Sequence, residues 1–396
     1  MLPHYASSSF DPQTSAATPM LSYQIDLNLD DAVHYHYDQF PPKELDYGLL
    51  VTPLVNATAA LARYDQMLKS MHNSEILLAP LRNQEAVISS RMEGTVSTMD
   101  EIMRYEADHT DVDGKSNVRS EVIETILYQR ALRAAQQSMK DGQPLSQFLI
   151  KAAHQRLLSF GRGASKSPGR YKTEQNYLAD RAKKNILFVP IKPEVLQDGM
   201  DALFKYLEES KDTPLLKAAI SHIEFEALHP FKDGNGRIGR MIITLLLWSS
   251  KVICEPHFYI SGYFEEHKDE YIDKMRRVSQ TGDWTSWCVF FLNAIENQAI
   301  KNLEVAEDIR QLYEQMKAIF GETLASKWSV KALDFVFTNP VFRSSKFTNT
   351  SDIPKASAQR SVRVLADKGL LTTIEEASGR RPALYSFEPL LQLVRV

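Results

Sequence analysis

The chain has 396 residues, a net charge of −4 and the composition of an ordinary soluble globular protein, with 43% hydrophobic and 24% charged residues. The small negative charge argues against bulk attraction to nucleic acid or an anionic membrane, and we expect no membrane partner because no apolar run reaches about 18 residues. No secretory signal is visible and the length predicts two or three domains, so we expect a multidomain cytoplasmic protein. Cys254 and Cys288 lie in apolar contexts and are expected to be buried free thiols.

The N-terminal part of the chain divides into two predicted segments. Residues 1–44 are small, polar and broken by prolines, which predicts a flexible or extended segment. Residues 45–110 are predicted to be helical. Apolar residues recur at helical spacing over residues 54–68, and a second helix is expected over residues 81–93, where Gly94 would end it.

Residues 111–320 form the largest predicted unit, and it is mainly helical. Apolar periodicity and proline or glycine boundaries place its helices at residues 122–135, 144–158, 193–209, 214–228, 265–280 and 284–320. The run Ile-Leu-Phe-Val-Pro-Ile at residues 186–191 predicts a short strand or extended flap.

Residues 229–240 read His-Pro-Phe-Lys-Asp-Gly-Asn-Gly-Arg-Ile-Gly-Arg and carry the clearest chemical signal. His229 can accept a proton, Asp233 offers a carboxylate to a hard cation, and the glycines let backbone N–H groups approach a ligand. Arg237 and Arg240 present planar donor forks that suit phosphate. The apolar stretch that follows predicts a buried helix, whose unpaired N-terminal amides favour an anion. The segment is therefore a candidate site for a phosphate-bearing ligand.

The full string resembles the signature of the Fic family, His-Pro-Phe-x-(Asp/Glu)-Gly-Asn-Gly-Arg-x-x-Arg, at every specified position. The resemblance covers roughly residues 80–300. It implies a mainly α fold, with a Fic helical core and a short β-hairpin flap. It also implies transfer of AMP from ATP to a Tyr, Thr or Ser hydroxyl of a target protein, or of the chain itself.

The resemblance also implies roles for the motif residues. His229 would be the general base, Asp233 would hold Mg²⁺, Arg237 would bind the β-phosphate and Arg240 the γ-phosphate. The other expected phosphate-binding residues are Gly234, Asn235, Gly236 and Gly239, with Asn235 on the α-phosphate.

An upstream segment resembles the inhibitory helix of Fic proteins. Ser89 to Gly94 match the pattern (Ser/Thr)-x-x-x-Glu-(Gly/Asn). Glu93 would pair with Arg240 and occupy the donor meant for the γ-phosphate, which predicts an autoinhibited AMP transferase. In some Fic proteins the same glutamate assists removal of AMP from a protein. The sequence separates AMP transfer neither from this removal nor from transfer of another nucleotide moiety at the same site.

Two regions resemble other family features more loosely. Residues 168–190 lie where a flap would pair with an extended target segment, with Phe188 and Val189 as candidate contacts, although residues 180–184 look like an insertion that leaves the target type open. Tyr263 and Tyr271 are candidates for the adenine pocket, with a role as core aromatics equally open.

The C-terminal residues 325–396 form a separate, basic unit. They hold eleven Lys or Arg and six Asp or Glu, a net charge of +5, which leaves −9 for the rest of the chain. The order of helices followed by two strands around a Gly-Arg-Arg-Pro turn resembles a winged-helix domain. It would bind DNA through Arg360, Arg363, Arg380 and Arg381, recognise a protein, or support a homodimer. A nucleotide-sensing transcriptional regulator is therefore the non-enzymatic alternative.

Overall fold

The computed structural model describes residues 29, 31–70, 74–109, 118–179 and 185–395. Within these ranges the chain is mostly helical, with two three-stranded sheets. The predicted mainly α fold class is confirmed.

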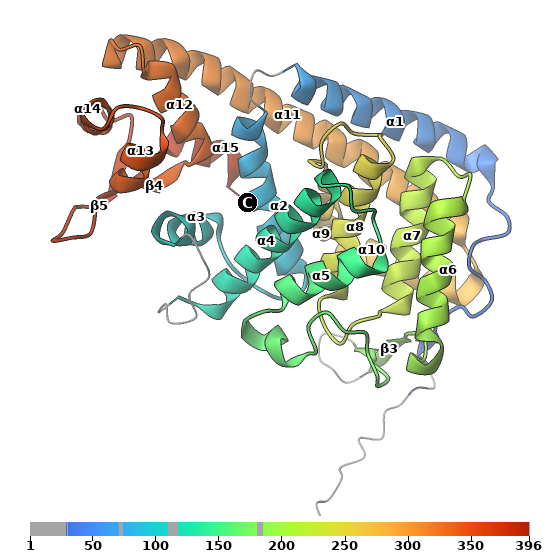
Figure 1. Ribbon diagram of the computed structural model, residues 1–396. Coiled ribbons are helices and arrows are strands. Elements are labelled where there is room, and N and C mark those ends of the chain that lie inside the picture. Colours follow the sequence, from blue (N-terminus) through green and yellow to red (C-terminus); the bar gives the residue numbers. More distant parts are fainter. Residues whose placement is uncertain (1–28, 30, 71–73, 110–117, 180–184, 396) are drawn as a thin grey trace, which may run out of the picture.

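Two long helices lie side by side along one edge of the molecule (Figure 1). Helix α1, Tyr47–Lys69, begins earlier than the sequence indicated because Asp46 caps it and accepts a hydrogen bond from the Gly48 amide at 2.9 Å. Helix α11, Trp284–Leu324, continues past residue 320 without a break. These helices support the helical core that carries the 229–240 motif.

The core around the motif is built from helices whose residues are buried on most sides. Helices α7, Pro214–Leu228, and α8, Asn235–Ser249, pack against each other, and nearly every residue of each is buried. This explains why their sequences are apolar without a polar face. The other helices of this core are α4 (Ser120–Lys140), α5 (Gln147–Leu157), α6 (Leu196–Glu209), α9 (Ser261–Glu266) and α10 (Lys268–Thr281), with the short 3₁₀ turns η1 (Gly161–Ser165) and η2 (Pro193–Val195).

A small sheet lies over the site in the order β1-β3-β2. Strands β2, Leu178–Ala179, and β3, Ile186–Val189, are antiparallel and form the expected flap. Strand β1, Val33–His34, pairs in parallel with β3, with Val33 opposite Phe188. The described N-terminal residues therefore include a short strand, which closes one edge of the flap strand. Residues 180–184, the expected insertion, lie outside the described residues.

The C-terminal elements pack on α2, Glu75–Met92, and α3, Met99–Asp108 (Figure 1). Their order is α12 (Ser329–Thr338), β4 (Val341–Arg343), α13 (Ser344–Thr350), α14 (Lys355–Asp367), β5 (Thr372–Glu375), β6 (Leu384–Ser386) and α15 (Glu388–Val394). The antiparallel sheet has the order β4-β6-β5. Strand β4 was not predicted, because three residues are too few to show alternation.

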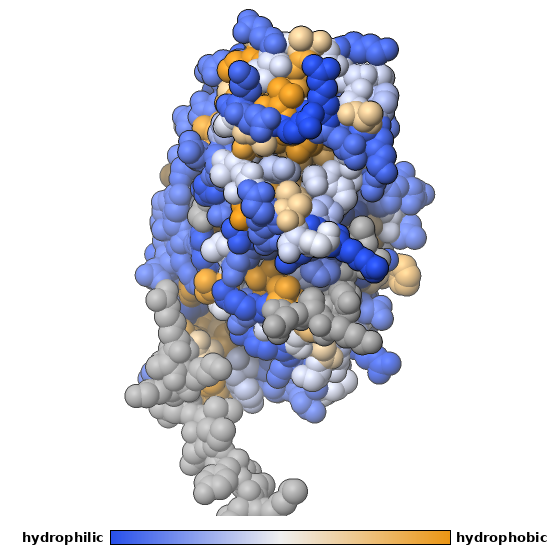
Figure 2. All heavy atoms as spheres, turned by 90° about the vertical axis from the view of Figure 1, so that its left-hand side faces the viewer, coloured by the Kyte–Doolittle hydropathy of each residue, from blue (hydrophilic) through white to orange (hydrophobic). Residues whose placement is uncertain are grey.

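An ion-pair cluster joins the C-terminal elements to α3. Arg343 is buried and contacts Asp108 at 2.6 Å and Glu375 at 2.7 Å. Arg381 also contacts Asp108, at 3.0 Å. Arg360, Arg363 and Arg380 are exposed. The side of the molecule that carries these elements is mostly hydrophilic, with scattered apolar patches (Figure 2).

Two expectations from composition can be compared with the described residues. No helix among them is long and apolar enough to cross a bilayer. Both cysteines are free, and Cys288 is buried as expected. Cys254 is exposed, contrary to expectation, because it lies in the turn after α8, where its backbone amide donates to Asp65 of α1.

Candidate active site

The motif loop connects α7 to α8 through two residues in the left-handed region. His229 ends α7 with φ 46° and ψ 59°, and Gly234 precedes α8 with φ 78°. A left-handed conformation strains a residue with a side chain, and such strain clusters at functional sites. Glycine adopts it freely, which explains Gly234. The chain thus reverses tightly between the end of α7 and the start of α8.

Asn235 fixes the loop from inside. Its Oδ1 accepts from the Phe231 amide and its Nδ2 donates to the Phe231 carbonyl, both at 2.8 Å. Asn235 is buried, and these two bonds use both ends of its amide. In this state Asn235 holds the loop; the α-phosphate contact expected from the sequence stays a prediction.

His154 of α5 supports the same loop and was missed by the sequence reading. Its ring stacks on Phe231 with centroids 3.7 Å apart, its Nε2 lies 2.9 Å from the Asp233 carbonyl, and its Nδ1 accepts from the Gly169 amide at 2.8 Å. Burial lowers the pKa of His154 to about 4, so the ring is neutral and can donate at one nitrogen and accept at the other. The only sequence signal was a histidine on the apolar face of a predicted helix.

A candidate anion-binding site, which we call the anion cradle, lies at the start of α8. The side chain of Arg237 is only 4% exposed, and its Nε and Nη1 have no hydrogen-bond partner among the described residues. Its Nη2 is 3.8 Å from Asp233 Oδ1. A buried guanidinium with unused donors, at a helix N-terminus, is arranged to receive a phosphate.

His229 lies beside this cradle with its Nδ1 buried and unpartnered within the described part of the chain. Burial and, second, the nearby Lys172 ammonium lower the pKa of His229 to about 4. The imidazole is therefore neutral near pH 7 and able to take a proton. Lys172 is itself buried, and its Nζ donates to Asn176 at 2.7 Å and to the Leu228 carbonyl at 3.1 Å.

Replacing Lys172 by Met is expected to move the acid limb of the pH–rate profile to higher pH. The neutral base is present above the His229 pKa and is lost as pH falls through it. Removing a cation that lowers this pKa therefore raises the pH at which activity disappears. The shift is expected to be partial, because burial, the larger cause, remains. The measurement is kcat/KM from about pH 3.5 to 8, with the exposed Lys211→Met as the matched control. An unchanged limb in Lys172→Met would contradict this assignment.

Glu93, at the end of α2, reaches Arg240 of α8. Glu93 Oε1 accepts from Arg240 Nη2 at 2.8 Å, while Ser89 Oγ and the Ser89 carbonyl accept from Arg240 Nε and Nη2 at 2.9 and 2.8 Å. A Cβ on Gly236 would lie 2.2 Å from Glu93 Oε1, so only glycine admits this carboxylate. Burial raises the pKa of Glu93, but Arg240, Arg237 and His229 outweigh it, and the pKa is lowered overall. Glu93 therefore stays ionised over the anion cradle.

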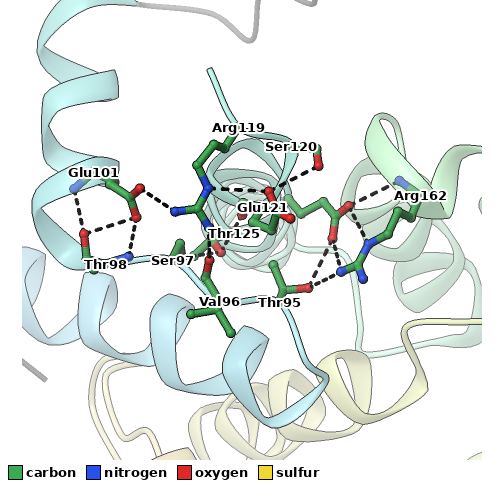
Figure 3. A network of polar contacts seen from close by, with 11 residues as sticks. Thr95, Val96, Ser97, Thr98, Glu101, Arg119, Ser120, Glu121, Thr125 and Arg162 are labelled. Atoms are coloured by element: carbon green, nitrogen blue, oxygen red, sulfur yellow. Dashed lines mark hydrogen bonds and ion pairs between the residues drawn. The ribbon is translucent and has the colours of Figure 1, made fainter. Parts of the chain in front are cut away.

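A network of polar contacts holds the segment that follows Glu93 (Figure 3). Glu124 of α4 is buried and accepts from Thr95 Oγ1 at 3.1 Å and from Arg162 Nε and Nη2 at 3.3 and 3.1 Å. Arg162 Nη2 also donates to Thr95 Oγ1 at 2.9 Å, and Arg119 donates to the Val96 carbonyl at 2.8 Å. We define Thr95, Glu124 and Arg162 as the latch. It ties the end of α2 to the core.

Arg162→Ala is expected to raise basal activity by about fivefold at most. The Arg162 side chain is 61% exposed, so its pairing with Glu124 contributes about 1 kcal/mol or less to holding the segment. The measurement is the initial rate of label transfer from ATP, with Arg310→Ala, which removes an exposed ion pair on α11, as control. On a Glu93→Gly background the change should add nothing; an equal further rise there would show that the latch does not act through Glu93.

A small cavity of about 200 Å³ adjoins His229 between the flap, α7 and α10. Phe188 lines it, together with Ile272 of α10, while Val189 pairs with β1. Neither tyrosine predicted for the adenine pocket lines it. Tyr271 is buried, with its hydroxyl 2.8 Å from His222 Nε2, and Tyr263 stacks on His267 at 4.0 Å.

Asp233 and Gly239 complete the predicted set. The Asp233 side chain is 42% exposed, and its Oδ1 accepts from the Gly234 amide at 2.7 Å. One accessible carboxylate beside a phosphate cradle fits Mg²⁺, which is usually held by one or two carboxylates together with substrate phosphates. Gly239 lets α8 approach α7, since a Cβ there would meet Glu226 at 2.2 Å.

Comparison with known proteins gives the family. The Fic/DOC family N-terminal model matches residues 51–137, and the Fic/DOC family model matches residues 144–247, which includes the motif loop and most of α8. The chain belongs to the Fic/DOC family. The Fic core thus spans the elements that position His229, Arg237 and Arg240.

Curated relatives of this Fic chain are similar over short stretches. Protein adenylyltransferase fic-1 of Caenorhabditis elegans is 33% identical over 104 residues, 26% of this chain and 19% of that protein. Protein adenylyltransferase Fic of Nematostella vectensis is 36% identical over 98 residues, 24% of this chain and 21% of that protein. The alignments therefore span about a fifth of the length of these relatives.

Two solved Fic structures share the fold. A Fic family protein from Desulfovibrio desulfuricans G20 has a TM-score of 0.54 at 18% identity, covering 88% of this chain and 98% of that one. Fic-1 from C. elegans has a TM-score of 0.51 at 19% identity, covering 67% and 75%.

Proposed function

We propose that this Fic protein is an autoinhibited protein adenylyltransferase, which transfers AMP from ATP to a Tyr, Thr or Ser hydroxyl of a target protein or of itself. One observation carries the proposal: the buried Arg237 Nε and Nη1 and the His229 Nδ1 have no hydrogen-bond partner among the described residues, and both side chains lie close enough to Glu93 to influence its pKa. This arrangement suits a phosphate chain beside a general base. The curated relatives named protein adenylyltransferases support the same activity.

The residues present account for each part of the transfer. The target hydroxyl oxygen forms a bond to the α-phosphorus while the bond from that phosphorus to the pyrophosphate oxygen breaks. His229 takes the hydroxyl proton, and pyrophosphate leaves with the electron pair of the broken bond. Arg237 and the first amides of α8 stabilise negative charge on the phosphates, so positioning and electrostatics provide most of the catalysis.

Asp233 is the residue proposed to hold Mg²⁺, and the ion would neutralise charge on the phosphates when bound. Asn235 and Gly234 shape the loop that presents Asp233. Glu93 is proposed to inhibit in cis, because its carboxylate occupies Arg240 and places negative charge in the cradle.

The experiment is an incubation of the full chain and Mg²⁺ with ATP labelled either in the adenine ring or at the γ-phosphate. AMP transfer leaves the adenine label on protein and releases the γ label in pyrophosphate. Protein that carries only the γ label would identify a kinase and overturn the proposal. Mass spectrometry of the labelled protein then locates the modified hydroxyl.

A second function, removal of AMP from a modified protein, is favoured by one observation. Glu93 lies close enough to His229 to raise the pKa of that ring, although burial and Lys172 lower it overall. We propose that the carboxylate orients a water near the same base. Release of AMP from a pre-modified target by wild type, together with no labelling from ATP, would select this alternative.

For residues 325–396 we propose a winged-helix domain that recognises a macromolecular partner. The exposed Arg360, Arg363 and Arg380 are available for DNA, whereas Arg381 is engaged with Asp108 and Glu375. We further propose that the chain forms a homodimer and acts in the cytoplasm. Salt-dependent DNA binding that persists after deletion of residues 1–320 would support the regulator alternative.

A further inference from the structure

Two residues outside the motif hold the backbone of the motif loop. The four consecutive carbonyls of residues 228–231 all accept hydrogen bonds from Lys172 or Asn176. Lys172 donates from Nζ to the Leu228 carbonyl at 3.1 Å and from its backbone amide to the Pro230 carbonyl at 2.8 Å. Asn176 donates from Nδ2 to the carbonyls on either side of Pro230, both at 3.1 Å. We call Lys172 and Asn176 the carbonyl clamp.

The two residues of the carbonyl clamp also hold each other. Lys172 Nζ donates to Asn176 Oδ1 at 2.7 Å, which uses the acceptor end of that amide. The amino end, with its two hydrogens, is therefore the one that faces the loop. Lys172 is 3% exposed, and a buried ammonium needs such partners because water does not reach it. The clamp is thus a connected polar unit to which the loop is bound.

The carbonyl clamp binds the backbone on both sides of a strained residue. His229 has φ 46° and ψ 59°, a left-handed conformation that is unfavourable for a residue with a side chain and persists only where the surrounding structure holds it. The His229 amide donates to the Phe225 carbonyl at 3.0 Å, and the clamp binds the carbonyl of His229 and those of its two neighbours. Because this backbone is fixed at both ends, the Cα–Cβ bond of His229 has a fixed direction.

Other residues hold the second half of the loop. Asn235 binds both backbone groups of Phe231, and His154 supports the Asp233 carbonyl. Among the described residues, no hydrogen bond or ion pair joins the carbonyl clamp to Arg237 or to the start of α8. The position of the base and the binding of phosphate therefore depend on different contacts.

We propose that Lys172 and Asn176 are positioning residues for AMP transfer, which act through the backbone of His229 to hold its ring where it meets the target hydroxyl. This inference rests on the proposed function, because it assumes that His229 takes the proton of that hydroxyl. A displacement of about 1 Å in a catalytic group can cost about 10²-fold in rate. Asn176 also lies two residues before β2, so the flap and the base share one point of attachment.

The experiment measures AMP transfer by the full chain at saturating ATP and Mg²⁺, together with the dissociation constant of ATP, on the Glu93→Gly background. Asn176→Ala should lower the rate by roughly 10- to 100-fold and leave the dissociation constant unchanged. Asn176→Asp keeps the shape of the side chain and its bond with Lys172 but cannot donate to the carbonyls, so it should lose the rate as well. Asn297→Ala is the matched control, because Asn297 Nδ2 donates at 2.8 Å to the Asn293 carbonyl on the exposed side of α11.

Two further measurements test the carbonyl clamp as a unit. Lys172→Met should lower the rate by a similar factor, and adding Asn176→Ala should lower it little further, because each residue holds the other. Additive losses would show that the two residues act separately and would overturn the clamp. Hydrogen exchange of residues 228–232 should become faster in Asn176→Ala and stay unchanged in Asn297→Ala, and this readout needs no activity.

The outcomes separate this inference from the proposed function. A full rate in Asn176→Asp would overturn the inference, since donation to the carbonyls would then be unnecessary. An equal loss of rate and of ATP affinity in Asn176→Ala would also overturn it, because the whole loop would then have loosened. If Asn176→Ala fails to fold, Asn176→Asp decides by the same readouts. If the Glu93→Gly background transfers no AMP, the proposed function fails; faster exchange in Asn176→Ala then still supports the hold on the loop, and unchanged exchange overturns it.

Discussion

Glu93→Gly is expected to raise AMP transfer by roughly 5- to 150-fold, the range of a coupling of about 1–3 kcal/mol. The change removes the 2.8 Å bond between Glu93 and Arg240, and it frees the guanidinium to bind phosphate. It also removes a carboxylate that stays ionised at neutral pH because Arg240 and Arg237 lower its pKa. Both effects favour the triphosphate, so the apparent affinity for ATP should rise together with the rate.

The measurement is the initial rate of adenine-label incorporation with and without Glu93→Gly. Glu265→Gly is a matched control. Glu265 of α9 pairs at 2.6 Å with Arg91 of α2, the helix that presents Glu93, and no ion pair joins Glu265 to Arg240 among the described residues. A comparable gain in Glu265→Gly would show that loosening α2, rather than removing the carboxylate, is what matters. Equal rates for wild type and Glu93→Gly would refute autoinhibition by this residue.

His229→Ala, on the Glu93→Gly background, is expected to lower AMP transfer by about 10²- to 10⁴-fold, the usual contribution of a positioned general base. The imidazole is neutral near pH 7, its pKa lowered to about 4 by burial and then by Lys172, so the ring acts as a base without first losing a proton. Affinity for ATP should change little, because Arg237 and the α8 amides hold the phosphates.

Two readouts separate loss of the base from loss of the loop. Calorimetric ATP binding checks the phosphate cradle, and thermal unfolding checks the fold. His154→Ala serves as the contrasting variant, because it removes the stack on Phe231 and two loop hydrogen bonds. It should weaken ATP binding as well as the rate. Full activity in His229→Ala would remove this histidine from the mechanism.

Those features of the site that lie close together in sequence could be predicted from it. Residues 229–240 are contiguous, so the turn and the start of α8 follow from their order, and apolar periodicity predicted most of the surrounding helices. The partnership of Glu93 with Arg240 joins residues far apart in the chain, and it was anticipated only through a family resemblance.

The remaining parts of the site depend on packing that one sequence does not reveal. His154 and Lys172 act through contacts made with the loop after folding, and neither lies in a recognisable motif. Burial raises the pKa of Glu226 to about 8. Its side chain packs against Gly239 of α8, and its position in a helix does not reveal this contact. Strand β1 has two residues and too little pattern to predict, yet it forms the outer strand next to the flap.

Helix α2 couples the C-terminal elements to the catalytic centre, because it contacts those elements and also presents Glu93 to Arg240. Helix α12 packs on α2, and Gln84 of α2 donates to the Val394 carbonyl at 2.9 Å, so the helix that presents Glu93 contacts both α12 and α15. If a partner of the C-terminal elements displaces α2 and thereby changes the affinity for ATP by some factor, ATP must change the affinity for that partner by the same factor. Titrating such a partner with and without ATP would therefore report on the inhibited state without any measurement of catalysis.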